Sequence, residues 1–114
     1  MKLLQTILIG ILLSSAAPAS ADFKTIALAS EVALSDLTSP ASENGIVSFR
    51  KCPDCEVQTV RVTEQTRYVV DGKSVELADF RKRIALVNDR ERATAIVMHH
   101  LESDTVTSIS VDIP

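Results

Sequence analysis

Apolar and polar residues alternate in four segments of the chain, and this alternation predicts β-strands. The segments are residues 45–51, 57–63, 93–101 and 105–113. In the first, Val47 and Phe49 occupy alternate positions, as Val60 and Val62 do in the second. Successive side chains of a strand point to opposite faces of the sheet, so one face of each segment is buried and the other meets water.

A tight turn and a helix are predicted between the second and third of these segments. Residues 68–75 carry Asp71-Gly72 between apolar runs, which suits a two-residue hairpin turn with positive φ at both positions. Apolar residues then recur every three or four positions at Leu77, Phe80, Ile84 and Val87. This spacing predicts an amphipathic helix of about 10 to 12 residues. Residues 88–92 are a solvated connection.

The resulting element order, β-β-β-α-β-β, defines a mainly β protein with one helix. Two architectures share this order: a small OB-like antiparallel barrel, and an open antiparallel sheet covered by the helix. The barrel is slightly favoured because closure removes exposed strand edges. Residues 45–114 form the predicted domain. Residues 22–44 are a leader segment, whose residues 25–34 are apolar enough for a short strand or a helical turn.

Residues 1–21 have the features of a cleaved signal peptide. Lys2 is followed by an apolar run over residues 3–13 and by small residues that end in Ala19-Ser20-Ala21. This arrangement predicts export, with cleavage after Ala21. The run is shorter than the roughly 20 residues of a membrane-spanning helix. We therefore expect a periplasmic or secreted protein with no membrane insertion after cleavage.

The charge balance argues against two classes of partner. The whole chain has a net charge of −3, and loss of Lys2 with the signal peptide makes the remainder one unit more negative. Aromatic residues make up only 4% of the sequence. Nucleic-acid binding needs a basic face and often stacking rings, and anionic lipid also attracts basic segments. We expect neither partner.

Cys52 and Cys55, in the segment KCPDC, are the candidate chemical site. In an oxidising compartment two cysteines usually form a disulfide, and Pro53-Asp54 favours the turn that joins them. The first interpretation of the cysteine pair is a disulfide with a purely structural role. A redox site is the second, although the alternating residues after Cys55 do not begin a helix, as such sites usually require.

A metal site is the third interpretation of the cysteine pair. His99 and His100 are the other candidate ligands, but adjacent residues of a strand point to opposite faces. Only one histidine, His99, is therefore retained beside Cys52 and Cys55. This leaves three of the four ligands that a tetrahedral metal site needs, and water, Asp104 or a second chain would complete it. The sequence predicts no cofactor.

Catalytic motifs do not emerge from the remaining residues. The chain has no G-x-S-x-G segment, and its three glycines are too scattered for a phosphate-binding loop. The basic run at residues 81–83 is typical of a solvated helix face, with acidic residues nearby in sequence. We expect a protein that is not an enzyme and has no catalytic residue.

Residues 45–83 and 106–113 carry a motif set that resembles a group of small exported bacterial proteins of unknown function. The shared positions are Gly45, Cys52, Cys55, Thr66, Tyr68, Asp71, Gly72, Val75, Leu77, Phe80, Val106, Thr107 and Ile109. They describe a C-x-x-C loop, a T-x-Y strand, a glycine turn, a helix start and a closing strand. The resemblance implies a periplasmic or secreted bacterial protein, and it implies no activity.

The expected function is a non-enzymatic binding or structural module of the bacterial envelope. A strand face, a loop or an uncovered edge strand would bind a protein or a small ligand. The alternative is a thiol redox or metal-handling protein that uses Cys52 and Cys55.

Overall fold

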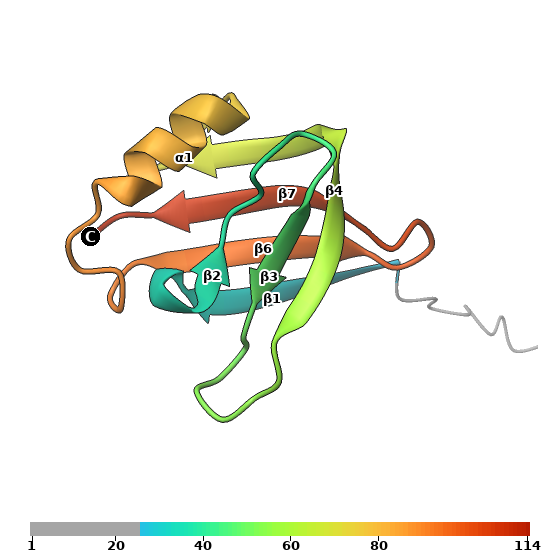
Figure 1. Ribbon diagram of the computed structural model, residues 1–114, viewed down its shortest axis with the longest axis horizontal. Coiled ribbons are helices and arrows are strands. Elements are labelled where there is room, and N and C mark those ends of the chain that lie inside the picture. The colour runs from blue at the N-terminus through green and yellow to red at the C-terminus, as the bar shows by residue number, and fades with distance from the viewer. Residues whose placement is uncertain (1–25) are drawn as a thin grey trace, which may run out of the picture.

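The structure of the protein, a computed structural model, describes residues 26–114. The predicted signal peptide, residues 1–21, lies outside the described residues. The elements are β1 Ala27–Ala33, the short 3-10 helix η1 Leu34–Asp36, β2 Leu37–Thr38, β3 Ile46–Phe49, β4 Gln58–Val70, β5 Lys73–Val75, α1 Leu77–Ala85, β6 Thr94–His100 and β7 Thr105–Asp112 (Figure 1). The described part is mainly β with one helix, as predicted.

The seven strands form one sheet that curls without closing. Their order is β1-β6-β7-β4-β3-β2, and β5 pairs with β4. Among the described strands, β1 and β2 lie at the two ends of this order and do not pair with each other. The result is a half-barrel (Figure 1). It has the curvature of a small barrel and the open edges of the second predicted architecture.

The expectation of a fully antiparallel sheet is wrong for one pair of strands. β4 and β7 run parallel, whereas the other pairs are antiparallel. The reason is the position of α1 between β5 and β6 in the chain. The helix carries the chain back to the end of the sheet where β5 began, so β6 runs in the direction of β5. Parallel neighbours require a crossover of this kind.

β4 is one strand of 13 residues, where the sequence predicts a strand and a separate hairpin arm. Its register against β7 shifts between Val62 and Arg67. At this bulge the hydroxyl of Thr66 accepts a hydrogen bond from the amide of Thr63 (2.9 Å) and donates one to the carbonyl of Val106 (2.6 Å). These bonds satisfy backbone groups that the bulge removes from the ladder, so the strand continues through a polar segment.

The predicted leader segment contributes β1 and β2 to the same sheet, and η1 joins the two strands. β1 pairs with β6 along its whole length, and β2 pairs with the end of β3. Arg90 links this segment to α1 by hydrogen bonds. Its guanidinium donates to the carbonyls of Ile84 in α1 (3.0 Å) and Leu34 in η1 (3.3 Å). The packed domain therefore includes residues before Gly45, and one side chain of the predicted solvated connection is structural.

The predicted hairpin turn is confirmed. Asp71 has φ 48° and Gly72 has φ 83°, the positive values that this turn type needs at both positions. The Asp71 carboxylate also accepts a hydrogen bond from the amide of Ile113 at 2.9 Å. The turn therefore anchors the end of β7 as well as joining β4 to β5.

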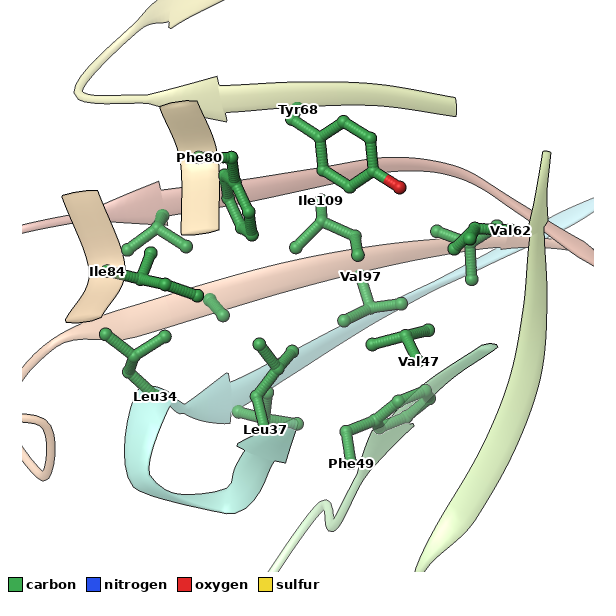
Figure 2. Close-up of a cluster of buried hydrophobic side chains, with 14 of the residues drawn as sticks. Leu34, Leu37, Val47, Phe49, Val62, Tyr68, Phe80, Ile84, Val97 and Ile109 are labelled. Carbon is green, nitrogen blue, oxygen red and sulfur yellow. The ribbon is translucent and has the colours of Figure 1, made fainter. Parts of the chain in front are cut away.

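The core lies between α1 and the concave face of the sheet (Figure 2). The helix buries Leu77, Phe80 and Ile84, three of the four positions that the spacing predicts. It ends at Ala85, so the fourth, Val87, lies after the helix and packs partly buried against the core. The inward-facing side chains of the strands complete this core, among them Val47, Phe49, Val62, Tyr68, Val97 and Ile109. α1 therefore packs across the concave face, and its first residues lie beside β4.

Candidate functional site

The cysteines lie in the loop between β3 and β4, with their sulfur atoms at disulfide-bonding distance. Their Cα atoms are 5.0 Å apart, and the amide of Cys55 donates to the carbonyl of Cys52 at 3.1 Å. Arg50 donates from its guanidinium to the carbonyl of Pro53 at 3.2 Å. The segment after Cys55 enters β4. The loop thus has the geometry of a closed, hydrogen-bonded turn.

The structure does not bring His99 to the cysteines. His99 contacts Asp104 through Nε2 and Oδ1 at 2.7 Å, and His100 contacts the hydroxyl of Ser103 at 3.1 Å. Both pairs tie the ends of the turn between β6 and β7. Within residues 26–114, no three or more histidine, cysteine or acidic side chains are placed to hold one metal ion. The three candidate ligands are therefore not a preformed metal site.

A different site lies where the bulge of β4 meets the first residues of α1. A pocket of about 320 Å³ opens there, within the size range of about 300–1,000 Å³ for small-molecule sites. Thr63, Glu64 and Thr66 line it from the bulge, and Glu76 and Leu77 from the start of α1. We call it the Tyr68 pocket, after one of the residues that line it.

Tyr68 is almost fully buried, with 4% of its surface exposed, and its hydroxyl has no hydrogen-bond partner. The ring packs against Phe80 at a centroid distance of 5.1 Å. Figure 2 shows the hydroxyl directed away from Phe80. Burial, with a smaller contribution from the charge of Glu43, raises the pKa of Tyr68 to about 12. At neutral pH the phenol is therefore protonated, and its buried oxygen has no hydrogen-bond partner.

Three carboxylates surround the opening of the Tyr68 pocket. Glu43 comes from the loop before β3, Glu64 from the bulge of β4 and Glu76 from the N-cap of α1, and all three are exposed. No lysine, arginine or histidine lines the pocket. The N terminus of α1 adds a partial positive charge of about half a unit, which three full negative charges outweigh. The residues that line the pocket therefore carry a net negative charge.

Arg81 holds one side of this opening in place. Its guanidinium donates to the carbonyl of Ala41 at 3.3 Å, which joins α1 to the loop that carries Glu43. Thr66 is held by its bonds to β4 and β7. These bonds fix Thr66 and the backbone of the loop at Ala41, and the three glutamates come from three different segments of the chain.

Comparison of the chain with protein-family models, with curated proteins and with solved structures finds no match. The resemblance carried by the C-x-x-C and T-x-Y motifs therefore stays a prediction. In residues 26–114 no helix has the length and apolarity needed to cross a membrane.

Sequence reasoning identified the cysteines and missed the Tyr68 pocket. Thr66 and Tyr68 were noted only as a T-x-Y pattern, and the three glutamates lie far apart in the chain. The one available signal was the single tyrosine of the sequence at an inward position of a strand. A phenol at a core position needs a partner for its hydroxyl. The partner, or its absence, becomes visible only in three dimensions.

Proposed function

We propose that the protein is an exported, non-enzymatic binding module that takes a small organic cation in the Tyr68 pocket. Export is supported by the signal-like residues 1–21 and by the paired cysteines, which suit an oxidising compartment. Binding is supported by one observation above all. The buried hydroxyl of Tyr68 has no partner, and Tyr68 lines a pocket whose lining also includes three glutamates.

A cation fits both features of the pocket. An ammonium group is a hydrogen-bond donor with a positive charge, so it can donate to the phenol oxygen and to the surrounding carboxylates. An anion would meet three negative charges, and an apolar ligand would leave the hydroxyl unpaired. Val75 and Leu77 supply an apolar wall for the carbon chain of an organic amine.

An organic cation suits the site better than a metal ion. Metal ions need several ligands that converge at distances of about 2.0–2.6 Å. The carboxylates of the Tyr68 pocket come from separate elements and form no such cluster within the described residues. A diamine or polyamine places its charges several bonds apart and matches carboxylates that are spread around an opening.

The pKa of Tyr68 supports a binding role over a catalytic one. General-base catalysis favours groups whose pKa lies near the working pH. The raised pKa of Tyr68, about 12, keeps its hydroxyl protonated at neutral pH. In that state it orients a ligand and does not remove a proton from it.

The test is calorimetric titration of the exported protein with putrescine at low ionic strength, with 1,4-butanediol as the uncharged control. We expect saturable binding of putrescine alone. Replacement of Glu43 and Glu76 by glutamine should weaken binding by about tenfold or more, since a hydrogen bond to a charged group contributes about 1.5–3 kcal/mol. Glu56→Gln, on an exposed residue outside the pocket lining, is the matched control. Equal effects of the two changes, or no saturation, would refute the proposal.

A thiol function of Cys52 and Cys55 is the second candidate, and Arg50 is the observation that favours it. Its guanidinium lies on the cysteine loop, and a nearby positive charge stabilises a thiolate. Alkylation with and without glutathione distinguishes the two roles. A bridge that glutathione reduces readily would support redox chemistry. A resistant bridge would leave the cysteines as a structural link.

A further inference from the structure

β1 is a seven-residue strand at the edge of the sheet. It pairs with β6 on one side, and no described strand pairs with its other side. Figure 1 shows it as the last strand beyond β6. An edge strand offers a row of backbone donors and acceptors to any strand that can align with it.

The hydrogen-bond pattern identifies which residues of β1 face outward. At one end of the ladder the carbonyl of Ile26 accepts from Leu101, and at the other the amide of Leu34 donates to Ala93. Hydrogen-bonded pairs alternate with non-bonded pairs in antiparallel strands. The even-numbered residues therefore bond to β6. The outward groups belong to Ala27, Ala29, Glu31 and Ala33.

The side chains of β1 do not protect this edge. Natural edge strands are commonly shielded by lysine, proline or a bulge. β1 has the sequence ALASEVA, its register against β6 is unbroken, and Glu31 is its only charged residue. The apolar Leu28 is 43% exposed on the strand itself, and Ile26 before it is 56% exposed. This edge is regular, small in side-chain volume and partly apolar.

The strand is complementary to a second copy of itself in one register. If Ser30 lies opposite Ser30 of the other copy, Ala27 meets Ala33 and Ala29 meets Glu31. All four outward residues then form hydrogen-bonded pairs. Leu28 lies across from Val32, so its exposed surface gains an apolar neighbour.

Other registers of β1 against β1 of a second copy have less favourable charge contacts or fewer hydrogen-bonded pairs. A register centred on Glu31 places two carboxylates directly opposite each other, which is destabilising. A register centred on Ala29 leaves Ala33 without a described partner. Charge and hydrogen-bond count thus select the arrangement centred on Ser30.

We propose that β1 pairs antiparallel with β1 of a second copy of this chain, in the register centred on Ser30, to form a two-fold dimer with a continuous sheet. Each copy uses its β1 edge once, so the contact closes and does not propagate into fibres. In this dimer the two Glu31 side chains are diagonal neighbours, about 7–8 Å apart. Their repulsion is screened by salt. Added salt and Glu31→Gln should therefore both strengthen association.

The first test is sedimentation equilibrium of the exported protein at concentrations up to about 1 mM, where weak pairs are still populated. Wild type should dimerise. Ala29→Pro should lower the association constant by about tenfold or more, because proline removes an outward N–H and leaves the ladder to β6 intact. Ala29→Ser keeps that N–H and is the control. A wild type that stays monomeric, or a dimer that Ala29→Pro does not weaken, would overturn the proposal.

The second test fixes the register by cross-linking. Residues of a non-hydrogen-bonded pair have Cα atoms about 4.5 Å apart, within the range that a disulfide spans. Ser30 is buried in the free chain, with 6% of its surface exposed, so the test needs a small oxidant. Ser30→Cys, oxidised with hydrogen peroxide, should therefore yield a covalent dimer. Ser108→Cys, on β7 between two strands, is the control and should stay monomeric. Equal cross-linking of the two variants would contradict the register. Because neither test uses a cation, its outcome is independent of ligand binding in the Tyr68 pocket.

Discussion

Replacement of Tyr68 by phenylalanine removes a single buried oxygen atom and should stabilise the protein that has no ligand. The hydroxyl is buried and has no partner, while the ring remains free to pack on Phe80. A buried polar group without a hydrogen bond costs about 1–3 kcal/mol. We expect Tyr68→Phe to raise the free energy of unfolding by this amount. In a domain of this size, each kcal/mol raises Tm by about 4–8 °C.

The pH dependence of stability gives a second readout of the same hydroxyl. The pKa of Tyr68 is about 12 in the folded protein and about 10 when exposed. Because the folded pKa is the higher one, the contribution of this group to stability is complete below pH 10 and is lost as the pH rises through 12. Two pKa units correspond to about 3 kcal/mol. Tyr68→Phe lacks this loss, so the stability difference between the two proteins should widen over this interval.

The assay is urea unfolding of both proteins, first at neutral pH and then in steps through the alkaline range. Thr66→Val is the matched contrast, because the hydroxyl of Thr66 lines the same pocket and has two partners. Its removal should cost about 1–3 kcal/mol. If Tyr68→Phe is destabilised by a similar amount, the phenol has a partner in the protein without ligand. Such a result would contradict a hydroxyl that is free to bond a ligand.

Three further changes test the fold around the site. Arg90→Met removes two bonds to backbone carbonyls and should cost about 2–3 kcal/mol in urea unfolding, whereas Arg92→Met, on an exposed ion pair, should cost under about 1 kcal/mol. Replacement of Cys52 and Cys55 by serine should cost about 2 kcal/mol or less, because the closed loop is short, and should leave putrescine binding unchanged. A larger loss, or lost binding, would contradict a purely local role. Gly72→Ala should lower the free energy of unfolding by about 1 kcal/mol. The cause is the φ of 83° alone, because no atom lies within 4 Å of the added methyl group. An unchanged free energy of unfolding would contradict this expectation.

The elements that the sequence predicted well are those with strong local signals. The alternation in residues 105–113, the three-and-four spacing from Leu77 and the Asp71-Gly72 turn each appear in the structure close to their predicted bounds. In each case the pattern reflects contacts with one buried face or one backbone conformation. Such signals need no knowledge of which strands pair.

The features that the sequence left open or did not predict depend on distant partners. β1 lies within residues 25–34, where a short strand and a helical turn were both open, because its alanine-rich alternation is weak and its pairing with β6 is not visible locally. The polar segment at residues 63–66 continues β4 because Thr66 bonds to Val106, 40 residues away. The parallel pairing of β4 and β7 likewise follows from the path of the chain through α1 and not from either strand alone.

The sequence predicts the cysteine pair as a candidate site but does not predict the Tyr68 pocket. Cys52 and Cys55 were found because a C-x-x-C spacing is local and specific. The Tyr68 pocket combines a bulge, a loop and a helix N terminus, and its carboxylates are separated by 12 or more residues in the chain. The pocket is distinguished by the Tyr68 hydroxyl, which makes no hydrogen bond. A pattern of residues in the sequence cannot indicate such a missing bond.

The most direct test of the central claim uses the fluorescence of Tyr68. The chain has one tyrosine and no tryptophan, so this signal comes from the pocket itself. Titration with putrescine at low ionic strength should give a saturable change that added salt weakens and that 1,4-butanediol does not produce. A signal that stays flat, or that drifts equally with both compounds, would contradict the proposal that the Tyr68 pocket binds a small organic cation.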